Sequence, residues 1–229
     1  MEKINKNDFI EIDFTGISND EIFDTTNPKD ADKLGINTEA VKPLIISVGN
    51  DMLLKGFDEQ LAGKELNKEY SIQLNPDKAF GPRNPNLIKT YSLNNFKKQN
   101  INPYPGMAIQ LDNLLARVIS VSGGRVIVDF NNPLAGKQVS YNFKILKKIT
   151  DNNEKINALQ DFFFRKRFDF KINENSKKVI FKEDIPLLKE FKDKFKEIIG
   201  FYFEVEKNGM ERGKKDMKNE KEESKIKVV

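Results

Sequence analysis

Five short segments stand out along this chain, and four of them join an aromatic side chain to a glycine or an aspartate. They are Phe14-Thr15-Gly16, Phe23-Asp24, Lys55-Gly56-Phe57-Asp58-Glu59, Ala79-Phe80-Gly81 and Asn131-Asn132-Pro133-Leu134-Ala135-Gly136-Lys137. A site built from them would be an aromatic-lined apolar hollow with one carboxyl group. Such a hollow can hold an apolar group by shape and its flanking peptide groups by hydrogen bonds.

The composition excludes most other catalytic chemistry. The 229 residues include no Cys, His or Trp. Thiol nucleophiles, disulfides, imidazole bases, zinc sites of the Cys/His kind and Ser-His-Asp triads are therefore excluded. With 38% hydrophobic and 32% charged residues, the chain has the composition of a globular protein of one to three domains. We expect no cofactor and no metal.

The charge distribution argues against nucleic acid as a partner. The formal net charge is +4, but residues 207–229 carry a surplus of three positive charges, which leaves the rest nearly neutral. A protein that binds a polyanion would concentrate Lys and Arg on one face. The chain has no apolar run long enough to span a membrane, and its first residues lack the apolar core of a signal peptide. We expect a cytoplasmic protein with no membrane partner.

The first 82 residues read mainly as β structure around one short helix. Asp51 is expected to cap a helix that places Leu53, Leu54, Phe57 and Leu61 on one face and ends at Gly63. The expected strands are residues 9–14, 44–48 and 70–74, with a polar, turn-rich stretch at 18–38 and a closing strand far downstream at 139–146. The first domain is therefore expected to be discontinuous, with residues 1–82 and 131–149.

Residues 83–130 read as a separate antiparallel meander. Strands are expected at 107–111, 115–121 and 126–130, and turns at Asp112-Asn113 and Ser122-Gly123-Gly124 separate them. Prolines at 82, 85, 103 and 105 disfavour long helices and stiffen the connections. We expect the two domains to move relative to each other.

Residues 150–206 are expected to form a third, α+β domain. Asp151-Asn152-Asn153 precedes a helix to about residue 164, and strands follow at 168–172 and 179–181. A second helix at 186–199 carries an apolar stripe of Leu187, Leu188, Phe191, Phe195, Ile198 and Ile199, and a strand at 201–205 follows Gly200. The small core and Phe162-Phe163-Phe164 suggest a homodimer through this domain, with docking onto the other domains as the alternative. The tail at 207–229 is expected to be disordered.

In their order along the chain, the five segments resemble the FKBP-type peptidyl-prolyl cis-trans isomerases. The likeness is to the SlyD-like long branch, in which a second domain interrupts the flap, and to its archaeal long-type members in the abundance of Lys, Asn and Ile. It implies an α+β fold: an FKBP-type antiparallel sheet wrapped on a short helix, an all-β insert-in-flap domain at 83–130 and a C-terminal α+β domain. It also implies X-Pro isomerisation in unfolded or nascent polypeptides, with chaperone (holdase) activity from the insert.

The resemblance, which covers residues 4–148, assigns roles to particular positions. Phe23, Phe57 and Tyr141 would hold the prolyl ring, the Leu54 N–H would bind the substrate, and Asp24 would lie near the reacting amide. The remaining pocket positions would be Phe14, Leu53 and Phe80, with Leu44 as a wall that contacts polypeptide. The reaction needs no proton transfer, because an apolar hollow favours the less polar, twisted amide over the planar one.

Three positions depart from the family pattern. Phe14 and Phe80 stand where the family has Tyr, so two hydroxyl groups are missing and macrolide inhibitors should bind weakly. Catalysis should survive, since one hydrogen bond contributes only about 1 kcal/mol. Asn132 stands where SlyD-like sequences have His, and the His-rich tail is absent, so metal regulation is not expected.

Each residue also has a structural interpretation. Taken singly, Phe23, Leu53, Leu54, Phe57 and Tyr141 could be core residues, and Asp24 a turn residue. In the insert, an exposed polypeptide-binding surface is expected from Tyr91, Leu93, Phe96, Tyr104, Met107 and Leu114, although Phe96 and Met107 fit the core of the meander better. The alternative functions are a polypeptide-binding chaperone without turnover and an assembly module.

Overall fold

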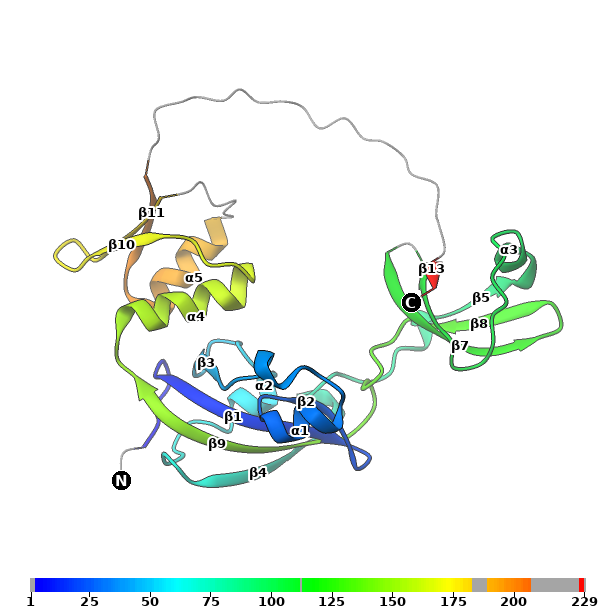
Figure 1. Ribbon diagram of the computed structural model, residues 1–229, viewed down its shortest axis with the longest axis horizontal. Coiled ribbons are helices and arrows are strands. Elements are labelled where there is room, and N and C mark those ends of the chain that lie inside the picture. Colours follow the sequence, from blue (N-terminus) through cyan, green and yellow to red (C-terminus); the bar gives the residue numbers. More distant parts are fainter. Residues whose placement is uncertain (1–2, 112, 183–188, 207–226, 229) are drawn as a thin grey trace. The chain divides into compact units, whose positions relative to one another are not determined.

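The computed structural model describes residues 3–111, 113–182, 189–206 and 227–228 (Figure 1). It has a mixed α+β fold with antiparallel sheets and few helices, which confirms the predicted fold class. The described residues divide into two compact units. One is drawn from 1–79 and 137–206, and the other from 80–136 with 227–228. The predicted boundary at residue 150 lies within the first unit and stays a prediction.

The first unit is built on β1 (Phe9–Ser18), which pairs antiparallel with β2 (Glu21–Thr25), β3 (Leu44–Ser47) and β9 (Val139–Ile149). The strand order is β2-β1-β9-β4, where β4 is Glu69–Leu74, and Figure 1 shows β1, β9 and β4 side by side. Ile10, Ile12 and Phe14 alternate along β1 and are buried. The prediction that a distant strand closes this sheet is confirmed.

The stretch from Ser18 to Thr38, predicted as polar turns, holds β2 and a short helix. Helix α1 (Pro28–Lys33) begins after Asn27, whose side chain accepts a hydrogen bond from the Lys29 N–H, and η1 (Thr38–Ala40) follows. The sequence of α1 has no apolar stripe from which a helix could be predicted, and the helix accordingly buries only Ala31.

The central helix is shorter than predicted, and Asp51 does not cap it. Helix α2 (Lys55–Asp58) begins after Leu54, whereas Asp51 has a left-handed φ of 58° outside the helix. The Asp51 N–H donates to the Asp58 carboxyl group. The sequence predicts the reverse, with the Asp51 carboxyl group accepting from an N–H of the helix. Leu61 is buried and Gly63 has a positive φ of 81°, as predicted. A Cβ on Gly56 would collide with the Lys78 carbonyl in η2 (Pro76–Lys78), so glycine lets α2 lie against that turn.

The second unit confirms the antiparallel meander and adds elements to it. Strands β6 (Ala108–Leu111), β7 (Leu114–Ser122) and β8 (Arg125–Asp129) follow one another, and β5 (Ile88–Ser92) pairs with β8. Gly123 and Gly124 have φ values of 56° and 75°, which a two-residue hairpin turn requires. Helix α3 (Leu93–Lys97), which Ser92 caps, and η3 (Pro85–Leu87) were not predicted.

The two chain segments that enter and leave the second unit are bonded to each other. Arg83 forms an ion pair with Asp129, and the Asn84 N–H donates to Asn131 Oδ1 at 2.8 Å. Asn131 Nδ2 donates back to the Asn84 carbonyl at 3.0 Å. These contacts tie the start of the insert to its end.

The C-terminal elements belong to the first unit. Helix α4 (Asn152–Phe164) is capped by Asp151, as expected, and a three-stranded sheet has the order β10 (Phe170–Asn173), β11 (Lys178–Phe181) and β12 (Tyr202–Val205). Helix α5 (Lys189–Ile199) packs Phe195 against Phe203 with 5.6 Å between ring centroids. Leu187 and Leu188 of the predicted stripe, and Pro186 at the predicted start of this helix, lie outside the described residues. Lys155 of α4 lies over the Phe9 ring of β1 at 5.8 Å.

Of the predicted tail, the structure describes only β13 (Lys227–Val228), which pairs antiparallel with β6. Val228 is opposite Ile109, and Lys227 is opposite Gln110. No helix within the described ranges is long and apolar enough to cross a membrane.

Candidate aromatic site

Strands β1, β2 and β9 and helix α2 bring five aromatic rings together in the first unit. The Phe57 ring of α2 stacks on Tyr141 of β9, with 4.5 Å between centroids and 27° between planes. Phe14 of β1 meets both rings edge-on at 5.8 Å. Phe143 packs against Phe57 at 5.1 Å. The predicted aromatics Phe14, Phe57 and Tyr141 therefore lie in contact with one another. Together with Phe23 they form what we call the aromatic cluster, against which Phe143 packs.

Phe23 reaches this cluster because of a β-bulge. In the β1–β2 ladder Gly16 is opposite Asp24 and Ile17 is opposite Ile22, which leaves Phe23 as the extra residue. A bulge turns the extra side chain away from strict alternation. The half-buried Phe23 ring lies 5.7 Å from Tyr141, edge-on.

Gly16 makes room for this contact. A Cβ at Gly16 would lie 2.7 Å from Phe23 Cζ and 3.0 Å from Tyr141 Cε1. Gly16 is also opposite Tyr141 in the β1–β9 ladder, so it lies between the two rings in the sheet. Only a residue without a side chain allows both rings to pack over the strand here.

Asp24 is opposite Gly16 on β2, which places its carboxyl group at the edge of the cluster. The residue is exposed overall, but desolvation of the carboxyl raises its pKa above the usual 3.8, against a hydrogen bond from the Thr25 backbone that lowers it. Burial and then the charge of Asp24 raise the pKa of the Tyr141 hydroxyl. The cluster therefore combines an apolar floor with one carboxyl group and one protonated phenol.

Leu53 and Leu54 lie at the start of α2 and are half-buried. Leu54 is the N-cap, and its carbonyl accepts hydrogen bonds from the N–H groups of Phe57 and Asp58 at 2.8 and 2.9 Å. Within the described part of the chain the Leu54 N–H has no acceptor. The binding of a peptide carbonyl by this N–H, which the resemblance implies, stays a prediction.

The remaining predicted positions fall outside the cluster or belong to the other unit. Leu44 lies on β3, opposite Ile12, and is 42% exposed. Phe80 is half-buried in the second unit, and its place in the pocket stays a prediction.

In the insert, Tyr104 and Leu114 are exposed, as a binding surface requires, whereas Tyr91 and Leu93 are half-buried against the core. Phe96 is fully buried and Met107 is also in the core, which confirms the core interpretation favoured for both and removes Phe96 from the predicted polypeptide-binding surface.

Sequence reasoning left three residues of the site without a role. Gly16, Phe143 and Asp58 were not candidates, although Gly16 and Asp58 lie within the motifs that carried the resemblance. A glycine inside a strand was the available signal for Gly16, because it commonly marks a bulge or a close approach. The Asp58 contacts depend on tertiary structure and had no such signal.

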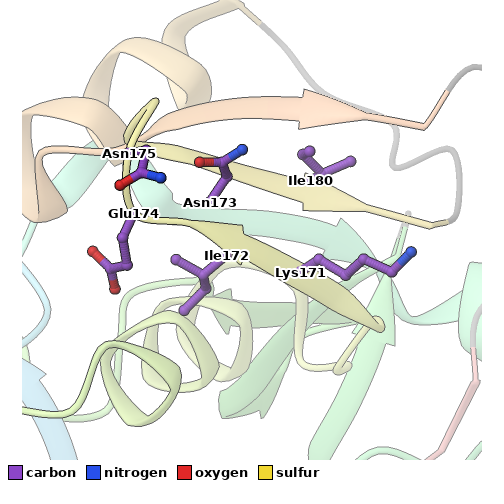
Figure 2. A pocket seen from close by; sticks show the side chains of 6 residues that line it. All are labelled: Lys171, Ile172, Asn173, Glu174, Asn175 and Ile180. Atoms are coloured by element: carbon purple, nitrogen blue, oxygen red, sulfur yellow. The ribbon is translucent and has the colours of Figure 1, made fainter.

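A hollow on the β10–β11 hairpin is separate from the aromatic cluster (Figure 2). Its lining residues are Lys171, Ile172, Asn173, Glu174, Asn175 and Ile180. Asn173 accepts a hydrogen bond from the Ser176 N–H, and Glu174 accepts one from Asn152. These polar groups therefore serve the local turn and its link to α4. Among the described residues no cluster of three or more acidic side chains could hold a metal ion.

Comparison with known families identifies the two parts. The model of the FKBP-type peptidyl-prolyl cis-trans isomerases matches residues 1–97, and the model of the FKBP26 IF domain matches residues 92–134. The chain carries an FKBP-type peptidyl-prolyl cis-trans isomerase domain. Together with the IF (insert-in-flap) match, this confirms the resemblance. The FKBP match ends before β9, so the cluster's Tyr141 comes from the strand that returns after the insert.

Named relatives agree with this assignment. The FKBP chain is 29% identical over 144 residues to the short-type peptidyl-prolyl cis-trans isomerase of Methanocaldococcus jannaschii, covering 62% of this chain and 92% of the relative. It is 29% identical over 111 residues to the FKBP-type 16 kDa isomerase of Escherichia coli, covering 46% and 74%. The match to SlyD of Aeromonas hydrophila is 28% over 110 residues, covering 47% and 51%.

We predict that Gly16→Ala lowers isomerase activity because the added methyl displaces the Phe23 and Tyr141 rings. The expected loss in kcat/KM is about tenfold, which corresponds to about 1.4 kcal/mol of transition-state stabilisation. Gly35→Ala is the control, since its Cβ would meet nothing within 4 Å and only its left-handed φ of 66° is strained. That variant should lose stability but keep kcat/KM per folded molecule. Equal kcat/KM for the two variants would contradict the steric role of Gly16.

We also predict that Asp24 lowers the free energy of unfolding as pH rises, which is opposite to the effect of an aspartate whose pKa is lowered on folding. Because its pKa is raised in the folded state, the native protein binds this proton more tightly than the unfolded chain does. The free energy of unfolding contributed by Asp24 should therefore fall as pH rises from 3.8 through the folded pKa. Urea unfolding at several pH values should show this slope, and Asp24→Asn should remove it.

Asp30 supplies a control of opposite sign. A hydrogen bond from Lys33, then one from Thr15, lowers the Asp30 pKa, so its contribution is lost as pH falls below 3.8. If Asp24→Asn changed the slope in the same direction as Asp30→Asn, the assignment of the raised pKa to Asp24 would be wrong.

Proposed function

We propose that this FKBP-type isomerase acts on X-Pro bonds in unfolded or partly folded polypeptides and that its insert domain holds those polypeptides as a chaperone. The observation that carries the catalytic part is the convergence of Phe14, Phe23, Phe57 and Tyr141 around Gly16. Unassisted X-Pro isomerisation takes tens to hundreds of seconds and can limit folding.

The reaction requires stabilisation of a twisted amide, without bond cleavage. The rotational barrier of about 20 kcal/mol comes from conjugation between the amide nitrogen and carbonyl. Twisting removes that conjugation and makes the amide less polar, so moving it from water onto an aromatic surface favours the transition state over the ground state. No side chain needs to transfer a proton, which agrees with a chain that has no His or Cys.

The ring contacts support the roles that the resemblance implies for individual residues. Phe23, Phe57 and Tyr141 would hold the prolyl ring, and Phe14 packs edge-on against Phe57 and Tyr141. The Leu54 N–H anchors a carbonyl of the substrate chain. Asp24 presents a carboxyl group at the rim, where it can interact with the rotating amide.

Two features of the insert support a polypeptide-holding role. Leu114 and Leu115 are 60% and 66% exposed on β7, beside exposed Ile119 and near the sheet edge at β6. Strand β6 also accepts Lys227–Val228 as an added antiparallel strand, so its edge can bond an extended backbone. Leu115 and Ile119 thus join Tyr104 and Leu114 as candidate contacts. A tethered holding site would raise the local concentration of proline segments.

The alternatives remain separate hypotheses. A binding protein without turnover would use the same aromatic cluster as a clamp. An assembly module, or a homodimer, would use the C-terminal region, where Tyr202 is 49% exposed. Cytoplasmic location, the absence of nucleic-acid and membrane partners, and dimerisation stay predictions.

We predict that Phe23→Ala and Asp24→Asn each lower kcat/KM on a Phe-Pro tetrapeptide by about tenfold or more, because each removes a contact with the reacting segment. Protease-coupled or NMR exchange measurements would give the rates. Ile36→Ala is the control, since Ile36 is exposed and lies outside the aromatic cluster. Equally low rates for the wild type and all variants would favour the clamp without turnover.

We predict that Leu115→Ser with Ile119→Ser weakens suppression of client aggregation at least about twofold, because it removes exposed apolar surface that unfolded chains would bind. Light scattering of a denatured client diluted into each variant measures this. Leu34→Ser with Ile36→Ser is the matched control, since both are exposed apolar residues of the first unit. Tetrapeptide isomerisation should be unchanged in both, and an equal loss of holding in the control would contradict the β7 surface.

A further inference from the structure

Asp58 stands apart from every other acidic residue that the structure describes. It is 4% exposed and is the one ionisable side chain among the buried polar residues of the described ranges. Burying a carboxyl group is costly unless hydrogen bonds replace its water. No ion pair within the described ranges involves Asp58, so its compensation comes from other contacts.

Two backbone N–H groups provide that compensation. Asp58 Oδ1 accepts from the Gly49 N–H at 2.7 Å, and Oδ2 accepts from the Asp51 N–H at 3.1 Å. Both donors are in left-handed conformations, with φ of 77° and 58°. The carboxyl group therefore spans a tight loop that no regular ladder stabilises.

Asn50, between the two donors, fixes the same loop from its other side. Its buried Nδ2 donates to Ser47 Oγ at 2.8 Å and to the Val48 carbonyl at 3.2 Å. The loop is thus held on β3 by Asn50 and on α2 by Asp58.

The loop lies just before the backbone that the proposed function assigns to substrate binding. Leu53 and Leu54 follow it, and the Asp58 N–H donates to the Leu54 carbonyl at 2.9 Å. The Asp58 side chain therefore accepts from the Gly49 and Asp51 N–H groups that precede Leu53, and the Asp58 backbone N–H donates to the Leu54 carbonyl. These contacts hold the chain on both sides of the Leu54 N–H.

We propose that Asp58 is a positioning residue for substrate binding. Its carboxyl group holds the Gly49–Asp51 loop so that the Leu54 N–H and the Leu53 and Leu54 side chains face the prolyl segment. This inference rests on the proposed isomerase site. Hydrogen bonds from N–H groups to a carboxylate are stronger than those between neutral groups, which suits a loop that must keep one geometry.

A positioning role and a purely structural role give different results. Loosening of the loop would weaken binding of a proline peptide to the folded protein. Simple loss of stability would reduce the folded fraction, which lowers apparent kcat but leaves the affinity of the remaining molecules unchanged.

The test compares Asp58→Asn with Ile10→Val in the full chain. The probe is a Phe-Pro tetrapeptide, titrated against ¹⁵N-labelled protein to give its Kd, with kcat and KM from exchange measurements. Asn offers one acceptor in place of two, so we expect Kd and KM to rise about fivefold. The Gly49 and Asp51 amide proton resonances should move upfield. Ile10→Val removes one buried methylene from the core of β1 and should lower stability with Kd unchanged.

An unchanged Kd in Asp58→Asn, with kcat reduced only by the lost folded fraction, would overturn the proposal. Because Kd is measured without turnover, the result stands even if the wild type proves inactive. A wild type that binds the peptide but does not isomerise it would overturn the isomerase function and leave the positioning role to be judged by Kd alone. Failure of the wild type to bind the peptide would overturn both.

Discussion

The close approach of Phe23 and Tyr141 across Gly16 is the constraint on which the site depends. Both rings occupy the space that a Cβ would take, at 2.7 and 3.0 Å. Tyr141 can then stack on Phe57, and Phe14 can meet both rings from β1. Aromatic pairs at such spacings add to simple burial, so the cluster is a rigid apolar surface. A site that works by withdrawing an amide from water needs such a surface.

Polar contacts hold the segments that surround this apolar floor. The Thr26 hydroxyl accepts from the Phe14 N–H at 2.7 Å and donates to Asp13 at 2.6 Å, which ties the end of β2 to β1. On the opposite side, Asn50 and Asp58 hold the loop before Leu53. Buried polar groups with every partner satisfied specify one arrangement, whereas apolar packing alone tolerates several. The hydrogen bonds thus set geometry, and the rings set the chemical environment.

The insert gives the chain a second kind of surface, distinct in its physical character. The aromatic cluster is largely buried and shaped, whereas Leu114, Leu115 and Ile119 lie exposed on β7. An open apolar strand surface can bind polypeptide segments of many sequences, whereas a cluster of fixed shape suits the prolyl ring. The reciprocal Asn84 and Asn131 hydrogen bonds join the start and end of the insert, so that it can fold as one unit within the interrupted domain. In the proposed function, polypeptide holding and X-Pro isomerisation therefore belong to different elements.

The sequence by itself determined the long strands, the insert meander and the capped helix α4, because alternation, caps and turn glycines act over a few residues. It also determined that catalysis proceeds without His or Cys. Its resemblance to the FKBP-type isomerases supplied the candidate cluster aromatics. Only the tertiary structure decided the bulge at Phe23, the space above Gly16, the burial of Phe96 and the bonding of Asp51 to Asp58 in place of a helix cap. Each depends on atoms from segments that meet only after folding. The ordered motifs therefore supplied candidate residues for the site by resemblance, while long-range packing decided which of them touch.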